Sequence, residues 1–304
     1  MEVAVGSELG VWQRRQSDAH IAECIAPSVT LFALADGFGE IGRGVSAAPV
    51  ALATLRDYLR RRYRAGSFGK SASPSNLRKI LHDALDYANA RLYAQSGSHE
   101  DYVASGTSLT AVLLVGHQAL VGHVGDARAY LLRLGRLEML TTDDAMFADA
   151  AVTSTKNIMP AKPRTRGLLW RSLGTQAKLE ASIAHVELLA GDQLVLCTDG
   201  VHRCIDDDEL AEAVGDSDTA ADAVARLLAT TKSRGNLDNG TLIVGRELLV
   251  ASAPSLGAGT SRYSPLRALV AIALVVASLL SFGAYWFHAG PPDHPAQNYT
   301  ANDR

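Results

Sequence analysis

The residue that first suggests chemistry is Asp36, which follows an apolar run at residues 29–35. Such a run is typical of a strand that is covered on both faces, and it carries Asp36 to the edge of the core. An ionised carboxylate there is costly unless a cation or hydrogen-bond donors meet it. The backbone that follows can turn tightly around a ligand because it has glycine at positions 37, 39, 42 and 44. For this stretch alone, an ordinary Asp-Gly turn is the alternative.

Three further acidic residues repeat this arrangement. The run QLVLCTDG ends in Asp199 and Gly200, and Asp238 and Asn239 come just before the apolar run TLIV. Asp126 lies between two strand-like runs in LVGHVGDARAYLL. If these ends meet, two carboxylates about 4 Å apart repel each other by about 4 kcal/mol at an effective dielectric constant of about 20, so the cluster needs cations. All the ligands are hard oxygens, which favours Mg²⁺ or Mn²⁺ over Zn²⁺.

The order of these segments resembles that of a known family, the metal-dependent protein phosphatases of type 2C in their bacterial branch. The resemblance covers residues 3–249 and rests on six segments in the same order and approximate spacing: ADGFGEIGRG, GTSLTAVLL, HVGDARAYLLRLGRLEMLTTDDA, RSLG, GDQLVLCTDG and DNGTLIV. Helical patterns occur in pairs between runs of strands, which favours an α+β fold for a domain at residues 1–249. The family implies the specific form, a four-layer αββα sandwich of two antiparallel sheets flanked by helices, with the metals at one end.

The resemblance also implies roles for single residues. Asp36 is expected to bridge two cations, Mn²⁺ or Mg²⁺, which activate a bridging water for hydrolysis of a phosphomonoester. Asp199 and Asp238 are expected to hold the first cation, and the Gly37 carbonyl is expected to complete a site. Asp126 matches a third, weaker metal position of the family. The catalytic residues are therefore expected to be Asp36, Asp199 and Asp238, and no Ser, Cys or His nucleophile is required.

The N-terminal segment departs from the family pattern. The Arg-x-x-Asn-Glu-Asp of the family aligns with QRRQSD, so Gln13 replaces an arginine that holds phosphate, and Ser17 replaces a glutamate near the metals. Asp18 is kept. Arg14 or Arg15, one or two positions away, is one candidate to replace the missing arginine, and Arg171 in the RSLG segment is another, with a structural salt bridge as its alternative role. The residues expected around the metals or the phosphate are Asp18, Arg14, Arg171, Asn239 and Ser17.

The sequence that follows the domain predicts a membrane anchor. Residues 250–265 are rich in Ala, Ser, Gly and Pro, as in a flexible linker. Residues 266–287 carry one charge, Arg267, and at about 1.5 Å per residue span about 33 Å, which matches a bilayer core. Arg262 and Arg267 precede this span, and no Lys or Arg follows it until the last residue. This bias favours a single-pass protein of the inner membrane, with a cytoplasmic catalytic domain and a short extracytoplasmic tail at 288–304.

Three hypotheses on function follow. Nucleic acid is not expected as a partner, because the 304-residue chain has a formal net charge of -3, whereas a nucleic-acid-binding protein is expected to carry a basic face. The first hypothesis is a membrane-anchored serine/threonine phosphoprotein phosphatase that acts on the substrates of a bacterial serine/threonine kinase. Loss of the arginine and glutamate favours the second, a weakly active or inactive pseudophosphatase that binds phosphoproteins or a membrane partner. A phosphatase of small metabolites is the third.

Overall fold

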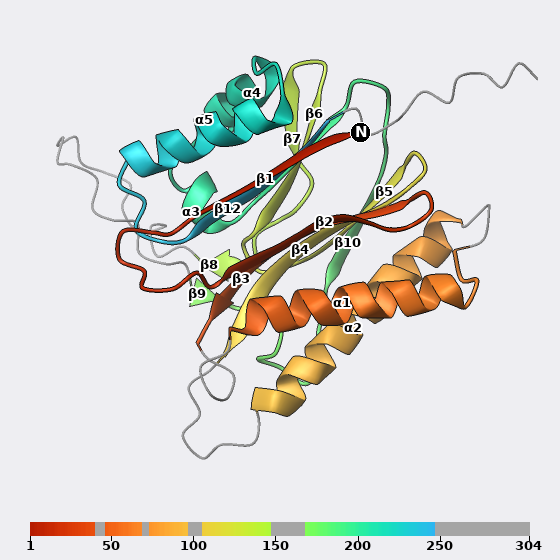
Figure 1. Ribbon diagram of the computed structural model, residues 1–304. Coiled ribbons are helices and arrows are strands. Elements are labelled where there is room, and N and C mark those ends of the chain that lie inside the picture. The colour runs from red at the N-terminus through yellow and green to blue at the C-terminus, as the bar shows by residue number, and fades with distance from the viewer. Residues whose placement is uncertain (40–45, 69–72, 97–104, 147–167, 247–304) are drawn as a thin grey trace, which may run out of the picture. The chain divides into compact units, whose positions relative to one another are not determined.

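The computed structural model describes residues 1–39, 46–68, 73–96, 105–146 and 168–246. Within these ranges, two five-stranded sheets, a two-stranded sheet and five helices belong to the compact unit Met1–Ala251 (Figure 1). The predicted linker, membrane span and tail lie outside the described residues. Among the helices that the structure does describe, none is long and apolar enough to cross a membrane.

All neighbouring strands of the two large sheets are antiparallel. The first sheet has the order β1 (Glu2–Glu8), β12 (Gly240–Arg246), β11 (Gln193–Cys197), β6 (Arg128–Arg133) and β7 (Arg136–Met139). The second sheet has the order β10 (Ser182–Glu187), β5 (Gln118–Val124), β4 (Gly106–Val115), β3 (Val29–Phe38) and β2 (Asp18–Ala26). The short strands β8 (Ala145–Met146) and β9 (Leu168–Leu169) form a separate pair.

Each large sheet is covered by helices on its outer face (Figure 1). The second sheet carries α1 (Ala47–Arg64) and α2 (Pro74–Ser96), and the first carries α4 (Asp207–Gly215) and α5 (Ala220–Ser233). The short helix α3 (Asp199–His202) packs against β11 and β12. The predicted four-layer sandwich of two antiparallel sheets flanked by helices is therefore confirmed.

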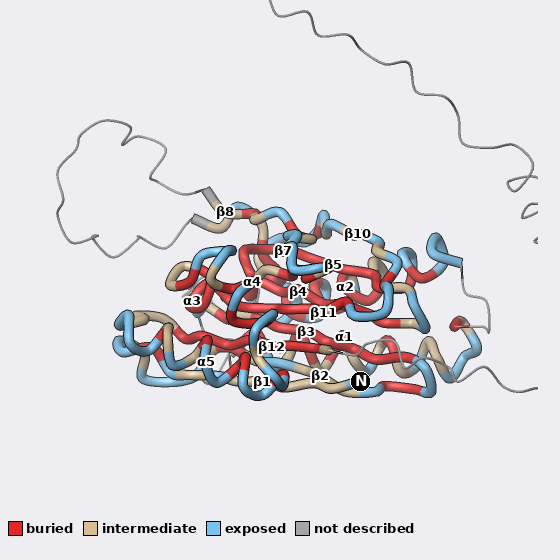
Figure 2. The backbone as a smooth tube through the Cα atoms, turned by 90° about the horizontal axis from the view of Figure 1, so that it is seen from above, coloured by how far each residue is buried: buried red, intermediate tan, exposed pale blue. Residues whose placement is uncertain are grey.

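Apolar side chains fill all three spaces between the four layers, as the buried inner strands in Figure 2 indicate. Strand β3 serves two of these spaces because successive side chains of a strand point to opposite faces. Leu31 and Ala33 pack toward the helices, whereas Phe32 and Leu34 pack between the sheets. The predicted burial of this strand on both faces is confirmed. The strand itself is longer than expected, because it continues past Asp36 to pair with the start of β4.

The register of the strands brings the loops of the candidate residues to one end of the sandwich. The end of β3 lies beside the start of β2, through the pair Asp36 and Asp18. In the other sheet, the end of β11 lies beside the starts of β6 and β12. The strand ends and the adjoining loops and helix start at this end therefore carry every aspartate that the sequence singled out.

Candidate metal centre

The strand faces between the two sheets change from apolar to polar at this end. In β3, Leu34 packs between the sheets, and Asp36 continues the same face two residues later. In β11, Leu196 packs between the sheets, and Thr198 follows two residues later. Thr198 Oγ1 donates a hydrogen bond of 3.0 Å to Asp18 Oδ2, which links the two sheets across this polar face.

Asp18 and Asp36 are direct cross-strand partners. Residues in this relation have Cβ atoms about 4.5–5.5 Å apart, so their carboxylates share one small space. Among the described residues, Asp18 Oδ1 and Asp36 Oδ1 have no hydrogen-bond partner, although both atoms are buried. Two ionised carboxylates cannot hydrogen-bond each other, because each only accepts. A proton or a cation is needed to hold this pair together.

Two glycines fix the loop that carries Asp238. A Cβ at Gly200, in α3, would lie 2.0 Å from the Asn239 carbonyl oxygen, and a Cβ at Gly10 would lie 2.3 Å from the Asp238 carbonyl oxygen. Only a residue without a side chain allows these approaches. The loop is therefore clamped between the β1–β2 connection and α3, which begins with Asp199.

The altered N-terminal segment contacts the same loop. Gln13 Nε2 donates to Asp238 Oδ1 at 2.7 Å, and Asn239 Nδ2 donates to Ser17 Oγ at 2.8 Å. Gln13 and Ser17 therefore lie beside the predicted metal ligands, as the alignment of this segment requires. Neither residue offers the positive or negative charge that the family places there.

Gly37 lies where the second sheet meets the start of α1. Ser46 caps this helix by accepting from the Ala48 backbone N–H, and its hydroxyl donates to the Ser17 carbonyl at 3.0 Å. A Cβ at Gly37 would lie 2.3 Å from Ser46 Oγ. The glycine thus lets the helix start pack against the strand end that carries Asp36.

Asp126 follows a sharp turn at Gly125, which has a φ of 105°. The Asp126 carboxylate accepts from Arg203 Nη2 at 3.3 Å, and its backbone carbonyl accepts from His202 Nε2 at 2.9 Å. Because a carbonyl only accepts, His202 carries its proton on Nε2. Burial lowers the pKa of His202 to about 4, so this histidine is neutral and structural, in line with its contacts.

The shifted pKa values of the aspartates reflect both their burial and how close these carboxylates lie to one another. The pKa of Asp36 is raised well above its ordinary value, first by burial and then by the charges of Asp18, Asp199, Asp238 and Asp126. Burial is also the main cause that raises the pKa of Asp18 to about 6 and that of Asp126 to about 7. The Asp36 carboxylate therefore lies within range of the charges of four other aspartates at this end of the sandwich.

The family assignment rests on comparison with known proteins. The model of the family described as protein phosphatase 2C matches residues 13–244. The chain belongs to the protein phosphatase 2C family. The serine/threonine protein phosphatase PstP of Mycobacterium tuberculosis is 30% identical over 247 residues, which are 80% of this chain but 44% of that protein. The chain thus spans less than half the length of this relative.

Solved structures of the family agree with the fold. A crystal structure of Mycobacterium tuberculosis PstP/Ppp matches with a TM-score of 0.63 and 29% identity, over 80% of this chain and 97% of that one. A catalytic domain of PstP in complex with 2 manganese ions matches with a TM-score of 0.63 and 27% identity, over 80% and 96%. The predicted membership in the bacterial branch of the protein phosphatase 2C family is confirmed.

The donor set of this phosphatase 2C domain fits a hard divalent cation. Asp18 Oδ1 and Asp36 Oδ1 are buried oxygens without a hydrogen-bond donor among the described residues, which is the environment a cation relieves. In the described part of the chain, no three His, Cys, Asp or Glu side chains converge as one finished coordination group. Binding would therefore require the carboxylates to rotate toward a common point, and the ligand roles of Asp36, Gly37, Asp199, Asp238 and Asp126 stay predictions.

The two arginines proposed to hold phosphate lie in different surroundings. Arg14 is exposed, in the connection between β1 and β2 next to Gln13. Arg171 forms an ion pair with the buried Asp144 and lies 4.3 Å over the Trp170 ring. Asp144 in turn accepts from the Gly125 N–H at 3.1 Å. The structure thus gives Arg171 the structural salt bridge that was its alternative role, and leaves Arg14 accessible.

Several residues that build the site have no signal in the sequence. Gly10 and Gly200 contribute because they have no side chain, which allows the backbone of another loop to approach closely. Thr198 and Thr241 form a hydrogen bond between segments that lie far apart in the chain. Arg203 was also missed. Its spacing of four residues from Asp199 is a recognisable ion-pair pattern, but the link to Asp126 appears only in the folded protein.

The raised pKa values predict how stability depends on metal and pH. Asp18 titrates at 3.8 when unfolded and at about 6 when folded, so the metal-free domain loses stability as the pH rises through this window. Mn²⁺ must displace those protons, so we expect it to raise Tm more at about pH 7.5 than at about pH 5.5, with affinity changing up to about tenfold per pH unit for each proton displaced. Calorimetry with and without Mn²⁺ at both pH values measures this. Equal shifts at both pH values would contradict it.

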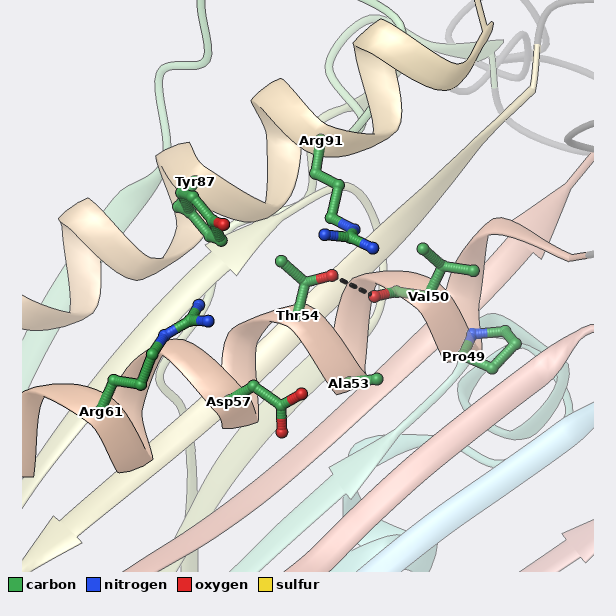
Figure 3. Close-up of a pocket in the computed structure, with 8 residues that line it drawn as sticks. All are labelled: Pro49, Val50, Ala53, Thr54, Asp57, Arg61, Tyr87 and Arg91. Atoms are coloured by element: carbon green, nitrogen blue, oxygen red, sulfur yellow. Dashed lines mark hydrogen bonds between the residues drawn. The ribbon is translucent and has the colours of Figure 1, made fainter.

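A surface cavity lies elsewhere, between α1 and α2 (Figure 3). It has a volume of about 360 Å³, and Arg61 lies 5.5 Å over the Tyr87 ring at one side of it, with Arg91 on the other helix. None of its lining residues is one of the aspartates of the candidate centre. The phosphatase 2C chemistry is therefore not located there.

Proposed function

We propose that this chain is a metal-dependent serine/threonine phosphoprotein phosphatase that hydrolyses phosphomonoesters. The observation that carries the proposal is the convergence of Asp18, Asp36, Asp126, Asp199 and Asp238 at one end of a phosphatase 2C fold, where four of them raise the pKa of Asp36. Buried like charges are costly, and a catalytic role explains why the fold retains them.

Some residues of the centre would bind the cations, and others hold these residues in position. Asp36 and the Gly37 carbonyl would hold two cations, with Asp199 and Asp238 completing the first site, and Mn²⁺ or Mg²⁺ suits these oxygens. When bound, such cations activate water and neutralise the charge that develops on the phosphate. The clamp formed by Gly10 and Gly200 holds Asp238 in position, and Thr198 orients Asp18.

The substrates we propose are phosphorylated Ser/Thr proteins, made by a bacterial serine/threonine kinase. Support comes from the bacterial relatives, which bear the name serine/threonine phosphatase. The exposed Arg14 is the residue we assign to contact with the substrate phosphate, because the aligned arginine position holds Gln13.

A pseudophosphatase is the second candidate, and one contact favours it. The Gln13 amide donates to Asp238 Oδ1, an oxygen of a carboxylate that the catalytic role assigns to the metal. A neutral amide there also lacks the charge that attracts phosphate. On this alternative, the domain binds phosphoproteins without turning them over.

Phosphate release from a phosphothreonine peptide tests both candidates. The 304-residue chain is expected to release phosphate in the presence of Mn²⁺. Phosphate release is expected to stop when a chelator is added. Release that persists in chelator would refute the metal-dependent reaction. Binding of the phosphopeptide without any release, with Mn²⁺ bound, would establish the pseudophosphatase instead.

We also propose that residues 266–287 anchor the protein in the inner membrane, with the catalytic domain in the cytoplasm. The support is the length and apolar character of this span and the two arginines that precede it. Protease added to spheroplasts is expected to remove a tag at the C-terminus and to spare the phosphatase domain. Digestion of the domain under these conditions, or recovery of the chain in the soluble fraction, would refute the proposal.

A further inference from the structure

Arg203 lies between two of the aspartates of the centre. Its Nη2 is 3.0 Å from Asp199 Oδ2 and 3.3 Å from Asp126 Oδ2. The two carboxylates are almost completely buried, with 3% and 5% of their side chains exposed, and the arginine side chain is 15% exposed. One guanidinium therefore bridges two buried carboxylates that come from different parts of the chain.

The backbone fixes Arg203 in this place. Its N–H donates to the Asp199 carbonyl at 3.0 Å, so it continues the turn of α3 and presents its side chain on the same face as Asp199. The neighbouring His202 donates to the Asp126 carbonyl at 2.9 Å. Two side chains at the end of α3 thus hold the Asp126 turn, one through its carboxylate and the other through its backbone carbonyl.

A divalent cation at Asp126 would compete with this guanidinium. Arginine keeps its charge at all ordinary pH values, and its donors reach both carboxylates at once. A cation that displaced it would leave a mostly buried guanidinium without its partners, which is strongly unfavourable. The Asp126 carboxylate is therefore already paired with the Arg203 guanidinium and is a poor ligand for a cation.

We infer that the Arg203 guanidinium takes the place of a third cation between Asp126 and Asp199, so that this centre holds two divalent cations and not three. The inference rests on the proposed function of the cluster as a metal centre. It changes the role of Asp126 from a metal ligand to the partner of Arg203, and it makes Arg203 a positioning residue for Asp199.

Counting bound Mn²⁺ tests the inference without any activity assay. Bound Mn²⁺ is separated from free Mn²⁺ by the loss of the free-ion electron paramagnetic resonance signal during titration of the 304-residue chain. The wild-type chain is expected to bind two Mn²⁺ ions, and Arg203→Ala is expected to bind one more. Arg133→Ala is a matched control, because Arg133 pairs with the buried Asp192 away from the centre, and it is expected to keep two.

Asp126→Asn gives a second measurement if Arg203→Ala fails to fold. With Arg203 in place, Asp126→Asn is expected to keep two ions, and combined with Arg203→Ala it is expected to remove the third. Three results would each overturn the inference while leaving the metal centre intact. They are binding of three ions by the wild-type chain, no added ion in folded Arg203→Ala, and loss of an ion in Asp126→Asn. A wild-type chain that binds no Mn²⁺ would overturn the proposed function and this inference with it.

Discussion

Asp36→Asn is expected to reduce Mn²⁺-dependent phosphate release by about 10³-fold, equivalent to ~4 kcal/mol of transition-state stabilisation. Asparagine has the same shape but no charge, so it removes the one carboxylate predicted to contact both cations. The strand remains, because Leu34 and its apolar neighbours pack as before. Measurement of kcat/KM with a phosphothreonine peptide, at saturating Mn²⁺, checks this.

The same substitution is expected to raise the Tm of the metal-free domain above pH 7. The pKa of Asp36 is raised in the folded state, so its ionisation costs stability as the pH rises, and asparagine removes that cost. Asp192→Asn is the control, because Asp192 is buried against Arg133 near the opposite ends of β6 and β11. It is expected to lower Tm while leaving kcat/KM of the folded protein unchanged. An Asp36→Asn enzyme within tenfold of wild type would refute the role of this carboxylate.

The elements that the sequence predicts well are those whose apolar residues follow a regular pattern along the chain. Strand β3 has apolar residues without a break from Leu31 to Ala35 because both faces are covered, and helix α1 has apolar residues at helical spacing because one face packs on the sheet. Strand β10 gives no such signal, since it lies at the edge of its sheet and its side chains are half-buried or exposed. Helix α3 is too short for any periodicity to show.

The candidate site is predictable in its residue types and much less so in its contacts. Aspartates next to apolar strands mark Asp36 and Asp199, and the family resemblance supplies their convergence. The ion pair from Arg203 to Asp126 joins residues 77 positions apart, and no local pattern encodes such a contact. The altered residues Gln13 and Ser17 were expected near the metals, and their hydrogen bonds to Asp238 and Asn239 place them there.

Gly200→Ala is expected to lower kcat/KM by about 10²-fold, because a displacement of about 1 Å in a catalytic group has an effect of that size. The added Cβ would lie 2.0 Å from the Asn239 carbonyl oxygen, which belongs to backbone and cannot rotate away. The loop must therefore shift, and Asp238 shifts with it. Such overpacking costs about 1–3 kcal/mol of unfolding free energy. Urea denaturation and steady-state kinetics measure the two effects separately.

Gly215→Ala provides the matched control, since it adds the same methyl group near the end of a helix on the same sheet. The nearest atom to its Cβ would be Leu132 Cδ2 at 3.8 Å, an ordinary contact. Alanine is a better helix former than glycine, so stability is expected to stay or rise by up to about 1 kcal/mol, with kcat/KM unchanged. If Gly200→Ala kept wild-type kcat/KM and Mn²⁺ affinity, the close packing of α3 on this loop would not be what positions Asp238, and the carboxylate would have to be held by Gln13 and its own loop alone.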